Sequence, residues 1–367
     1  MPTTPRLPEP AKGHLGDLGD LGDRVERELT EPVDLCDERG HLAPAARGWS
    51  RRPLHRANLR GPWGRQKRWE YWCVTTPDLY VSMTYADIDY VGIAGLWICR
   101  PADGLVIDVA RLVPLARGIT LPDEPGTGTM ASEGRRLALT IAEHADHTRL
   151  TASAPDTTHG PVTVDLTVDR PPGHESLNVV IPWSDRRFQY TSKQNTRPAR
   201  GQVGLGGDVS TVGGPAGSPD EAFGTLDLGR GIWPYSIRWN WGTASGRSAD
   251  GRLVGLQFGG KWTEGTGHTE NGLCVDGRLT KIHDELVWEY DWDRPLQPWR
   301  VHDPVGGRVD AILTPVHDKH SRTSLGALSM EVHQVFGTWS GRLRTEAGDE
   351  VAFEGIVGWA EEARNRW

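Results

Sequence analysis

Carboxylates close to aromatic residues are the side chains of this sequence with the clearest chemical potential. Asp227 precedes Trp239 and Trp241 in the segment TLDLGRGIWPYSIRWNWG, and the two tryptophans share one strand face at spacing i, i+2. A carboxyl group in a dry aromatic pocket has a raised pKa and can act as a general acid. Indole rings stabilise developing positive charge. Asp227 is therefore a candidate catalytic acid, and Trp239 and Trp241 are candidate ligand-binding residues.

Two further segments add polar residues to this aromatic background. Glu270 and Asn271 stand at the entrance of an expected strand in TGHTENGLCVDG, where Glu270 is a second candidate acid and Asn271 could orient a ligand. In TYADIDYVG we expect Asp87 and Asp89 on one strand face, with Tyr90 beside them, as further ligand-binding residues. Each carboxylate also has a simpler interpretation, as a turn residue or a structural hydrogen-bond acceptor.

Signals for a metal or a cofactor are weak. His317 and His320 flank Asp318 in TPVHDKHSRT, but a metal site usually needs a third protein ligand placed by the fold. We interpret this segment as a polar loop with exposed histidines and predict no metal site. GxSxG, HExxH and Walker motifs are missing, and VGLGGDVSTVGG lacks the strand-to-helix context of a dinucleotide loop. We therefore expect no cofactor.

Charge argues against a nucleic-acid partner. The chain has 41 basic and 49 acidic residues, a net charge of −8, whereas phosphate-backbone binders need a basic footprint. The strip RQKRWEYW, residues 65–72, interleaves cations with aromatics as single-strand binders do. Against the acidic background we interpret it as a strand whose aromatic residues pack inside.

Location is inferred from what the sequence lacks. The N-terminus does not resemble a secretory signal, and no stretch has the roughly 18 continuous apolar residues of a membrane helix. Four scattered cysteines are typical of free thiols in a reducing compartment. We expect a soluble cytoplasmic protein without membrane insertion.

The elements that must position these residues are β-strands. From about Trp69 the apolar residues alternate with period two, and turn signals separate many short segments. Asp276-Gly277 is a strong hairpin signal. We predict an all-β protein of two tandem antiparallel barrels, with a disordered leader over 1–24, one barrel over 25–197 and another over 198–367. The Gly-rich stretch 198–219 is the expected connecting loop.

Several strings in order resemble a known family. LCDERGHLAPAARGWSRRPLHRANLRGPWGRQKRWEYW, LDLGRGIWPYSIRWNWG, HTENGLCVDG and HQVFGTWSG resemble landmarks of a bacterial family known only as domain of unknown function number 2804. The resemblance covers nearly the whole chain after the leader. Since that family has no established activity, it implies membership and no mechanism.

A more distant resemblance is to lipocalin-like tandem-barrel proteins, which include carotenoid hydratases, AttH-like proteins and tocopherol cyclases. It rests on an Asp, a Gly and a W-x-W pair, here Asp227, Gly231, Trp239 and Trp241. The resemblance implies two lipocalin-like (calycin) barrels with an apolar ligand in or between them. Leu228 stands where the hydratases have a His, which leaves their acid–base chemistry open for this chain.

Three hypotheses follow for the function. The protein could bind an apolar small molecule and catalyse cofactor-independent protonation, hydration or cyclisation. It could instead be a non-catalytic carrier of a lipophilic ligand. A purely structural role, with every tryptophan in the core, is the third. The sequence leaves the ligand's identity and the oligomeric state open.

Overall fold

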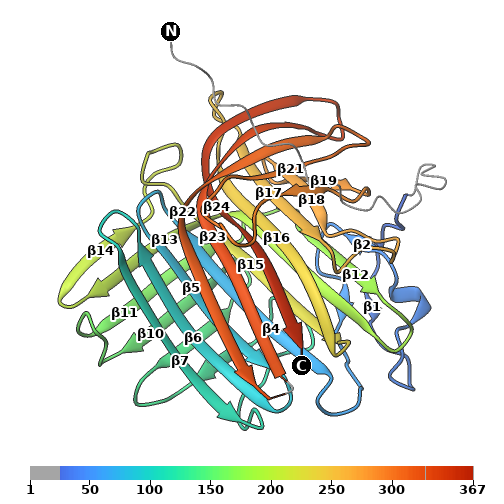
Figure 1. The fold of residues 1–367 in the computed structure, drawn as a ribbon, viewed down its shortest axis with the longest axis horizontal. Helices are drawn as coiled ribbons and strands as arrows, with labels where there is room; N and C mark the ends of the chain where they lie inside the picture. The colour runs from blue at the N-terminus through green and yellow to red at the C-terminus, as the bar shows by residue number, and fades with distance from the viewer. Residues whose placement is uncertain (1–24, 327, 367) are drawn as a thin grey trace.

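The computed structural model describes residues 25–326 and 328–366, so the predicted leader over 1–24 lies outside the described residues. Apart from one 3-10 turn at Pro44–Ala46, the regular structure of the described residues consists of β-strands (Figure 1). The predicted all-β class is therefore confirmed. No helix in the described ranges is long and apolar enough to cross a membrane.

The first sheet is antiparallel and contains thirteen strands. Its main path runs β7-β6-β5-β4-β15-β13-β11-β10-β9-β8, while β12 and β14 pair with β13, and β2 pairs with β12. The strands are β2 (Trp49–Ser50), β4 (Gln66–Thr75), β5 (Tyr80–Asp87), β6 (Val91–Arg100), β7 (Leu105–Pro114), β8 (Thr129–Ser132), β9 (Ala138–Glu143), β10 (His147–Ala154), β11 (Val162–Asp169), β12 (Leu177–Pro182), β13 (Phe188–Leu205), β14 (Asp208–Val212) and β15 (Ala222–Ile232).

The second sheet has nine antiparallel strands in the order β19-β18-β17-β16-β24-β23-β22-β21-β20. A separate short parallel pair joins β1 (Val33–Asp34) to β3 (His55–Arg56). The strands of the second sheet are β16 (Ser236–Arg247), β17 (Leu253–Gly260), β18 (Asn271–Val275), β19 (Arg278–Ile282), β20 (Val287–Glu289), β21 (Trp299–His302), β22 (Val309–Leu325), β23 (Leu328–Arg344) and β24 (Glu350–Arg366).

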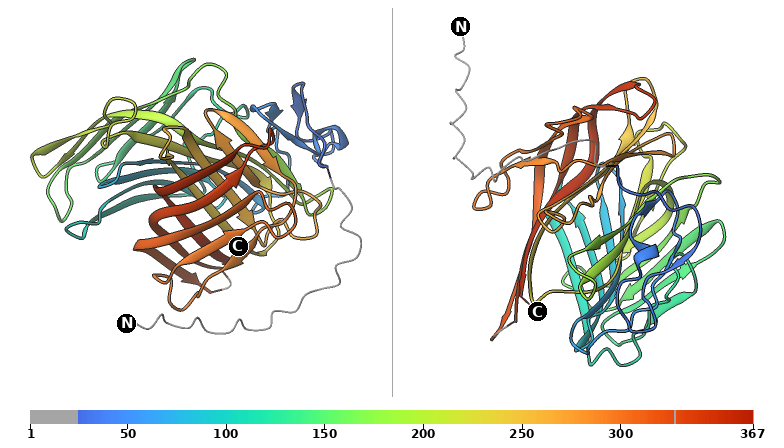
Figure 2. Two further views of the ribbon diagram at one scale, coloured as in Figure 1. Left: turned by 90° about the horizontal axis from the view of Figure 1, so that it is seen from above. Right: turned by 90° about the vertical axis from the view of Figure 1, so that its right-hand side faces the viewer.

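The two sheets curl and pack against each other, as the three views agree (Figures 1 and 2). Each sheet encloses a hydrophobic core of its own. Two further clusters, both rich in tryptophan, contain residues from both sheets and lie at their junction. The predicted fold of two antiparallel β units is confirmed, with each unit formed by one curled half-barrel sheet.

The Gly-rich stretch 198–219 does not connect the two sheets. Its first residues extend β13 to Leu205, β14 pairs back onto β13, and β15 then lies between β13 and β4 in the first sheet. The chain passes to the second sheet only after Ile232. Glycine permits this hairpin because Gly206 and Gly207 adopt positive φ at its turn. The division of the chain into folding domains at residue 198 stays a prediction.

Local turn signals gave mixed results. The Asp276-Gly277 hairpin is confirmed, since both residues have positive φ between β18 and β19. The segment predicted as a polar loop, TPVHDKHSRT, is instead part of β22 and pairs with β23. The polar and charged residues that suggested a loop belong to a long strand with one partly exposed face.

Candidate functional site

A buried ion-pair cluster joins the two sheets. The Lys193 Nζ on β13 lies 2.7 Å from Asp227 Oδ1 on β15 and 3.1 Å from Glu270 Oε1, which directly precedes β18. The side chains of Lys193 and Glu270 are 6% and 2% exposed, and that of Asp227 is 13% exposed. Asp227 is therefore the carboxyl group of this cluster with the greatest access to solvent.

Strand register explains why these residues meet. Lys193 and Asp227 are direct partners in the β13–β15 pair, and Asp227 is the partner of Tyr71 in the β15–β4 pair. Partners in an antiparallel pair project from the same face. That face contacts the second sheet, where the ring of Trp241 on β16 lies 4.2 Å from Lys193 Nζ.

Two half-buried indoles each hold a carboxylate at this junction. Trp69 Nε1 donates to Asp227 Oδ2 at 3.1 Å, and Trp239 Nε1 donates to Glu361 Oε1 on β24 at 2.8 Å. Gln334 on β23 also donates to Glu361, at 3.0 Å. Each of the two tryptophans thus places an apolar ring directly beside an acidic group.

More tryptophans surround the half-buried pair. The buried ring of Trp233 lies at the centre, with centroid distances of 5.2–5.9 Å to Trp69, Trp183, Trp239 and Trp262. Most of these pairs are edge-to-face, an arrangement favoured by the ring quadrupoles. The result is a rigid aromatic wall next to Asp227.

Burial changes the acidity of the cluster. Desolvation raises the pKa of Glu270 to about 7, even though the Lys193 ammonium opposes the shift and Asp227 adds to it. Desolvation also raises the pKa of Glu361 to about 7, against the hydrogen bond from Trp239. For Lys193, burial disfavours the charged form, but the adjacent Asp227 and Glu270 outweigh it and raise the pKa. Lys193 therefore stays charged at neutral pH, whereas Glu270 and Glu361 have pKa values of about 7.

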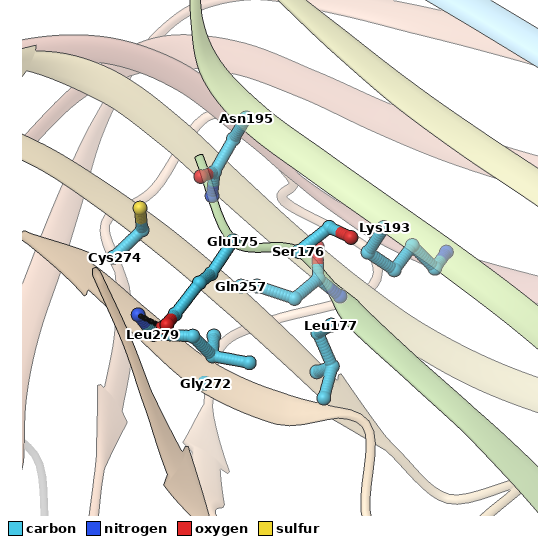
Figure 3. Close-up of a pocket in the computed structure, with 9 residues that line it drawn as sticks. All are labelled: Glu175, Ser176, Leu177, Lys193, Asn195, Gln257, Gly272, Cys274 and Leu279. Carbon is cyan, nitrogen blue, oxygen red and sulfur yellow. Dashed lines mark hydrogen bonds between the residues drawn. The ribbon is translucent and has the colours of Figure 1, made fainter. Parts of the chain in front are cut away.

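Two cavities border the junction. A space of about 10 Å³ lies between Lys193 and Cys274, which line opposite sides of it. Figure 3 shows the ammonium nitrogen of Lys193 pointing away from Cys274. That volume suits a single water molecule. A larger cavity of about 300 Å³ lies where β4, β15, β16 and β24 meet, lined by Phe223, Ser245 and Val357 among others. Phe223 is four residues along β15 from Asp227, or about 13 Å.

Four of the eight predicted site residues come together here: Asp227, Glu270, Trp239 and Trp241. Asn271 does not join them, since it accepts from the Gly259 N–H at 2.8 Å and donates to the Asp284 carbonyl at 3.0 Å. These bonds are structural.

Asp87, Asp89 and Tyr90 also lie apart from the cluster. The expectation that Asp87 and Asp89 share a strand face is wrong, because Asp89 follows the end of β5 in a turn with φ of 70°. Asp87 accepts from the Asp89 N–H, and Asp89 accepts from the Gln66 N–H. Tyr90 packs under the Lys67 ammonium. These contacts stabilise the turn between β5 and β6.

Sequence reasoning missed Lys193, Glu361 and Trp69 as site residues. Trp69 belongs to the segment RQKRWEYW, which we interpreted from the sequence only as a strand whose aromatic residues pack inside. Lys193 and Glu361 each stand in a strand whose neighbouring residues are mostly buried. A charged residue inside such a strand was the available signal, because buried charges occur almost only in pairs.

Comparison with known proteins identifies the family. The chain belongs to the family described as Domain of unknown function (DUF2804), whose model matches residues 26–367. No curated protein matches the sequence.

Solved structures are similar at low identity. CghA with Sch210972 is 12% identical, with 83% of this chain and 89% of that chain covered and a TM-score of 0.42. A putative AttH from Nitrosomonas europaea is 14% identical, with 81% and 92% covered and a TM-score of 0.43. Kievitone hydratase from Nectria haematococca is 12% identical, with 83% and 89% covered and a TM-score of 0.41. Scores this low carry no argument about activity.

Proposed function

We propose that this protein binds an apolar small molecule against Trp69 and Trp239 and catalyses its protonation, followed by hydration or cyclisation, without a cofactor. The observation that supports the proposal is the buried Asp227–Lys193–Glu270 cluster directly behind half-buried indoles. Acid groups next to an apolar binding surface are what such a reaction requires.

The charges of the cluster supply the proton. Asp227 and Glu270 both pair with the ammonium of Lys193, Glu361 lies within the electrostatic reach of Lys193 and Lys319, and the pKa of both glutamates is about 7. Like charges held close together cannot all ionise, so a proton stays on the carboxyl groups near neutral pH. Glu270 holds this proton, and Asp227, the most exposed carboxyl group of the ion-paired cluster, is the group that faces the bound molecule.

The reaction then balances in two steps. A carbon–carbon double bond of the substrate takes the proton from the carboxyl groups of the cluster, and the adjacent carbon becomes a cation. The ring of Trp239, on the binding surface, stabilises that cation through its π face, an interaction of about 2 kcal/mol when desolvated. Water or an internal double bond supplies the electron pair that quenches the cation. The proton then lost, from the oxygen or a neighbouring carbon, returns to the carboxylate.

The test begins with native mass spectrometry of freshly purified protein, which identifies any apolar molecule that co-purifies. Asp227→Asn should then abolish conversion of that molecule or its precursor while retaining binding. Glu38→Gln, at an exposed position, is the matched control. Equal conversion by the wild type and Asp227→Asn would refute the proposed role of Asp227.

A carrier function is the second candidate, and the cavity of about 300 Å³ favours it. Its volume falls at the lower end of the range for small-molecule pockets, and it lies about 13 Å along β15 from the carboxylate cluster. If the protein is a carrier, Phe223→Asp should abolish binding. Asp227→Asn should bind like the wild type, and the wild type should return the ligand unchanged.

A further inference from the structure

We propose that His320, Glu331 and His333 form a binding site for a divalent transition-metal cation of the zinc class. The three residues lie on the β22–β23 hairpin, and each offers one donor atom, with these atoms all within 4.8 Å of one another. Two imidazoles and a carboxylate are a donor set that suits zinc.

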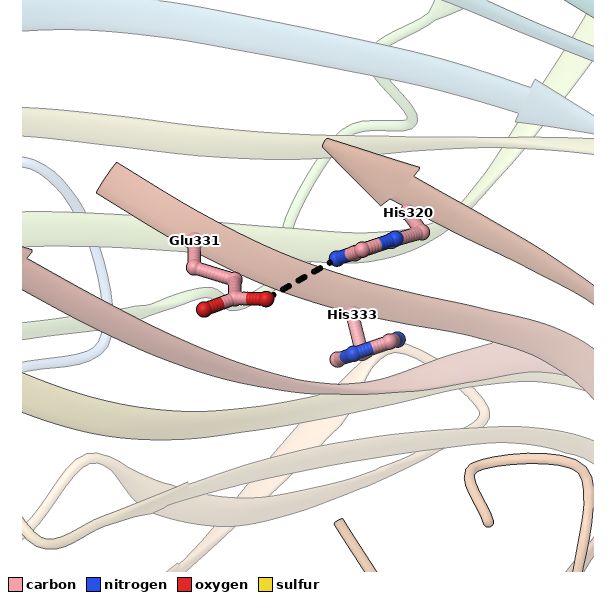
Figure 4. Close-up of side chains that lie close together, drawn as sticks. All are labelled: His320, Glu331 and His333. Carbon is pink, nitrogen blue, oxygen red and sulfur yellow. Dashed lines mark hydrogen bonds and ion pairs between the residues drawn. The ribbon is translucent and has the colours of Figure 1, made fainter. Parts of the chain in front are cut away.

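Strand pairing places the third donor that the sequence alone did not reveal. His320 on β22 is the direct partner of His333 on β23, so their side chains share one face of the sheet. Glu331 is two residues before His333 and therefore lies on that same face. Figure 4 shows the two imidazole rings one above the other, with the Glu331 carboxylate reaching His320.

The donor atoms lie close enough together to bind one metal ion after one imidazole ring has rotated. The His320 Nε2 lies 3.2 Å from Glu331 Oε1, and the two imidazole rings are parallel with centroids 4.1 Å apart. Donor atoms around a tetrahedral zinc ion, at bond lengths near 2 Å, are about 3.4 Å apart. Because the two rings are parallel, their in-plane nitrogen lone pairs do not converge on one point, so the exposed His320 ring must rotate about its side-chain bonds to bind the ion.

A further carboxylate orients one of the imidazoles. The His333 Nδ1 lies 2.8 Å from Asp318 Oδ2, so Nδ1–H donates to Asp318 and leaves the Nε2 lone pair for a metal. The ring edge of Trp292 also packs on His333, at a centroid distance of 4.5 Å. A carboxylate–histidine pair of this kind is the usual support of a metal ligand.

Solvent access completes the site. The side chains of His320 and Glu331 are 43% and 30% exposed, so a hydrated cation can reach them and keep a water ligand in the fourth position. The neighbouring Lys319 does not compete, because its ammonium lies on the opposite face of the strand, against the rings of Tyr71 and Trp97. The proposed metal site is therefore separate from the Asp227 cluster.

The test uses the full chain without an affinity tag. Co²⁺ titration should give one bound ion per chain with visible absorption of tetrahedral type, and Zn²⁺ should displace it. His320→Ala, His333→Ala and Glu331→Gln should each abolish this absorption. Asp318→Asn should retain the site with roughly tenfold or greater loss of affinity.

His159→Ala, which removes an exposed histidine in a distant turn, is the matched control and should bind like the wild type. Circular dichroism of each variant without metal checks its folding. His320 is an exposed residue, so its variant remains informative even if His333→Ala is unstable. Failure of the wild type to bind Co²⁺ and Zn²⁺, or binding that survives both histidine substitutions, would overturn the proposal.

Discussion

The Lys193 ammonium on the first sheet lies 3.1 Å from the carboxylate of Glu270, which leads into the second sheet. This contact is a buried ion pair at a junction of the two curled sheets that is rich in aromatic rings. Neither group is exposed enough for water to replace its partner. The pair therefore couples the chemistry of the site to the packing of the two sheets.

Loss of the cation should be severely destabilising. In Lys193→Met, Asp227 and Glu270 remain buried without their counter-charge, and breaking such a pair costs about 3–5 kcal/mol. The free energy of unfolding in urea at pH 7 measures the loss. Adding Asp227→Asn and Glu270→Gln to Lys193→Met should recover much of it. If Lys193→Met alone were as stable as the wild type, the ion-pair cluster would contribute little to the free energy of unfolding.

Stability should depend on pH through Glu270. Its pKa rises from 4.5 to about 7 in the folded protein, so between these values the folded chain holds a proton that the unfolded chain releases. The stability from this group is complete below pH 4.5 and is lost as the pH rises to about 7.

In Glu270→Gln, the decline in unfolding free energy between pH 4.5 and 7 should become shallower, by at most about 1.4 kcal/mol per pH unit. Urea unfolding at a series of pH values checks this, with Glu38→Gln as the control. Parallel pH profiles for Glu270→Gln and the wild type would contradict the raised pKa.

A single added methyl group should disrupt the cluster. A Cβ at Gly259 on β17 would lie 2.7 Å from both the Cβ and the Oε2 of Glu270. Gly259→Ala should displace Glu270 and lower the unfolding free energy by about 1–3 kcal/mol through overpacking. Gly95→Ala is the control, since its Cβ would meet Thr84 at an ordinary 3.7 Å. Similar thermal midpoints for the two variants would show that the site tolerates the methyl group.

The indole of Trp239 should tune the acidity of Glu361. Its N–H donates to the carboxylate and lowers the pKa of Glu361 against the effect of burial. Trp239→Phe keeps a ring but removes the donor, so the pKa of Glu361 should rise further above 7.

NMR titration of ¹³C-labelled glutamate carboxyl groups measures the shift in the Trp239→Phe variant. Trp262→Phe is the control, because the Trp262 N–H has no hydrogen-bond partner among the described residues. A carboxyl signal that titrates at the same pH in the wild type and Trp239→Phe would contradict the role assigned to this bond.

Much of the fold could be predicted from local patterns. Period-two alternation and turn residues identified the strands, because these signals come from residues close together in the sequence. The Asp276-Gly277 hairpin is an example. The Gly-rich hairpin of β13 and β14 was missed, since glycine supplies tight turns within a sheet as readily as flexible connections.

The candidate site could be predicted only in part. Asp227, Trp239 and Trp241 stand close together in one segment, so spacing was enough to group them. Lys193 reaches Asp227 through the register of β13 against β15, and Glu270 through the contact of the two sheets. Neither relationship is encoded in local spacing. The same holds for His320 and His333, which pair across two strands.

The pairing of β4 with β15 has a consequence for synthesis of the chain. Strand β4 ends at Thr75 and β15 begins at Ala222, so about 150 residues must leave the ribosome before one edge of β4 finds its partner. At the usual rate of 5–20 residues per second, that edge stays open for roughly 8–30 s. Open strand edges are templates for aggregation. During that interval the nascent chain therefore presents an unpaired strand edge to which other chains can add.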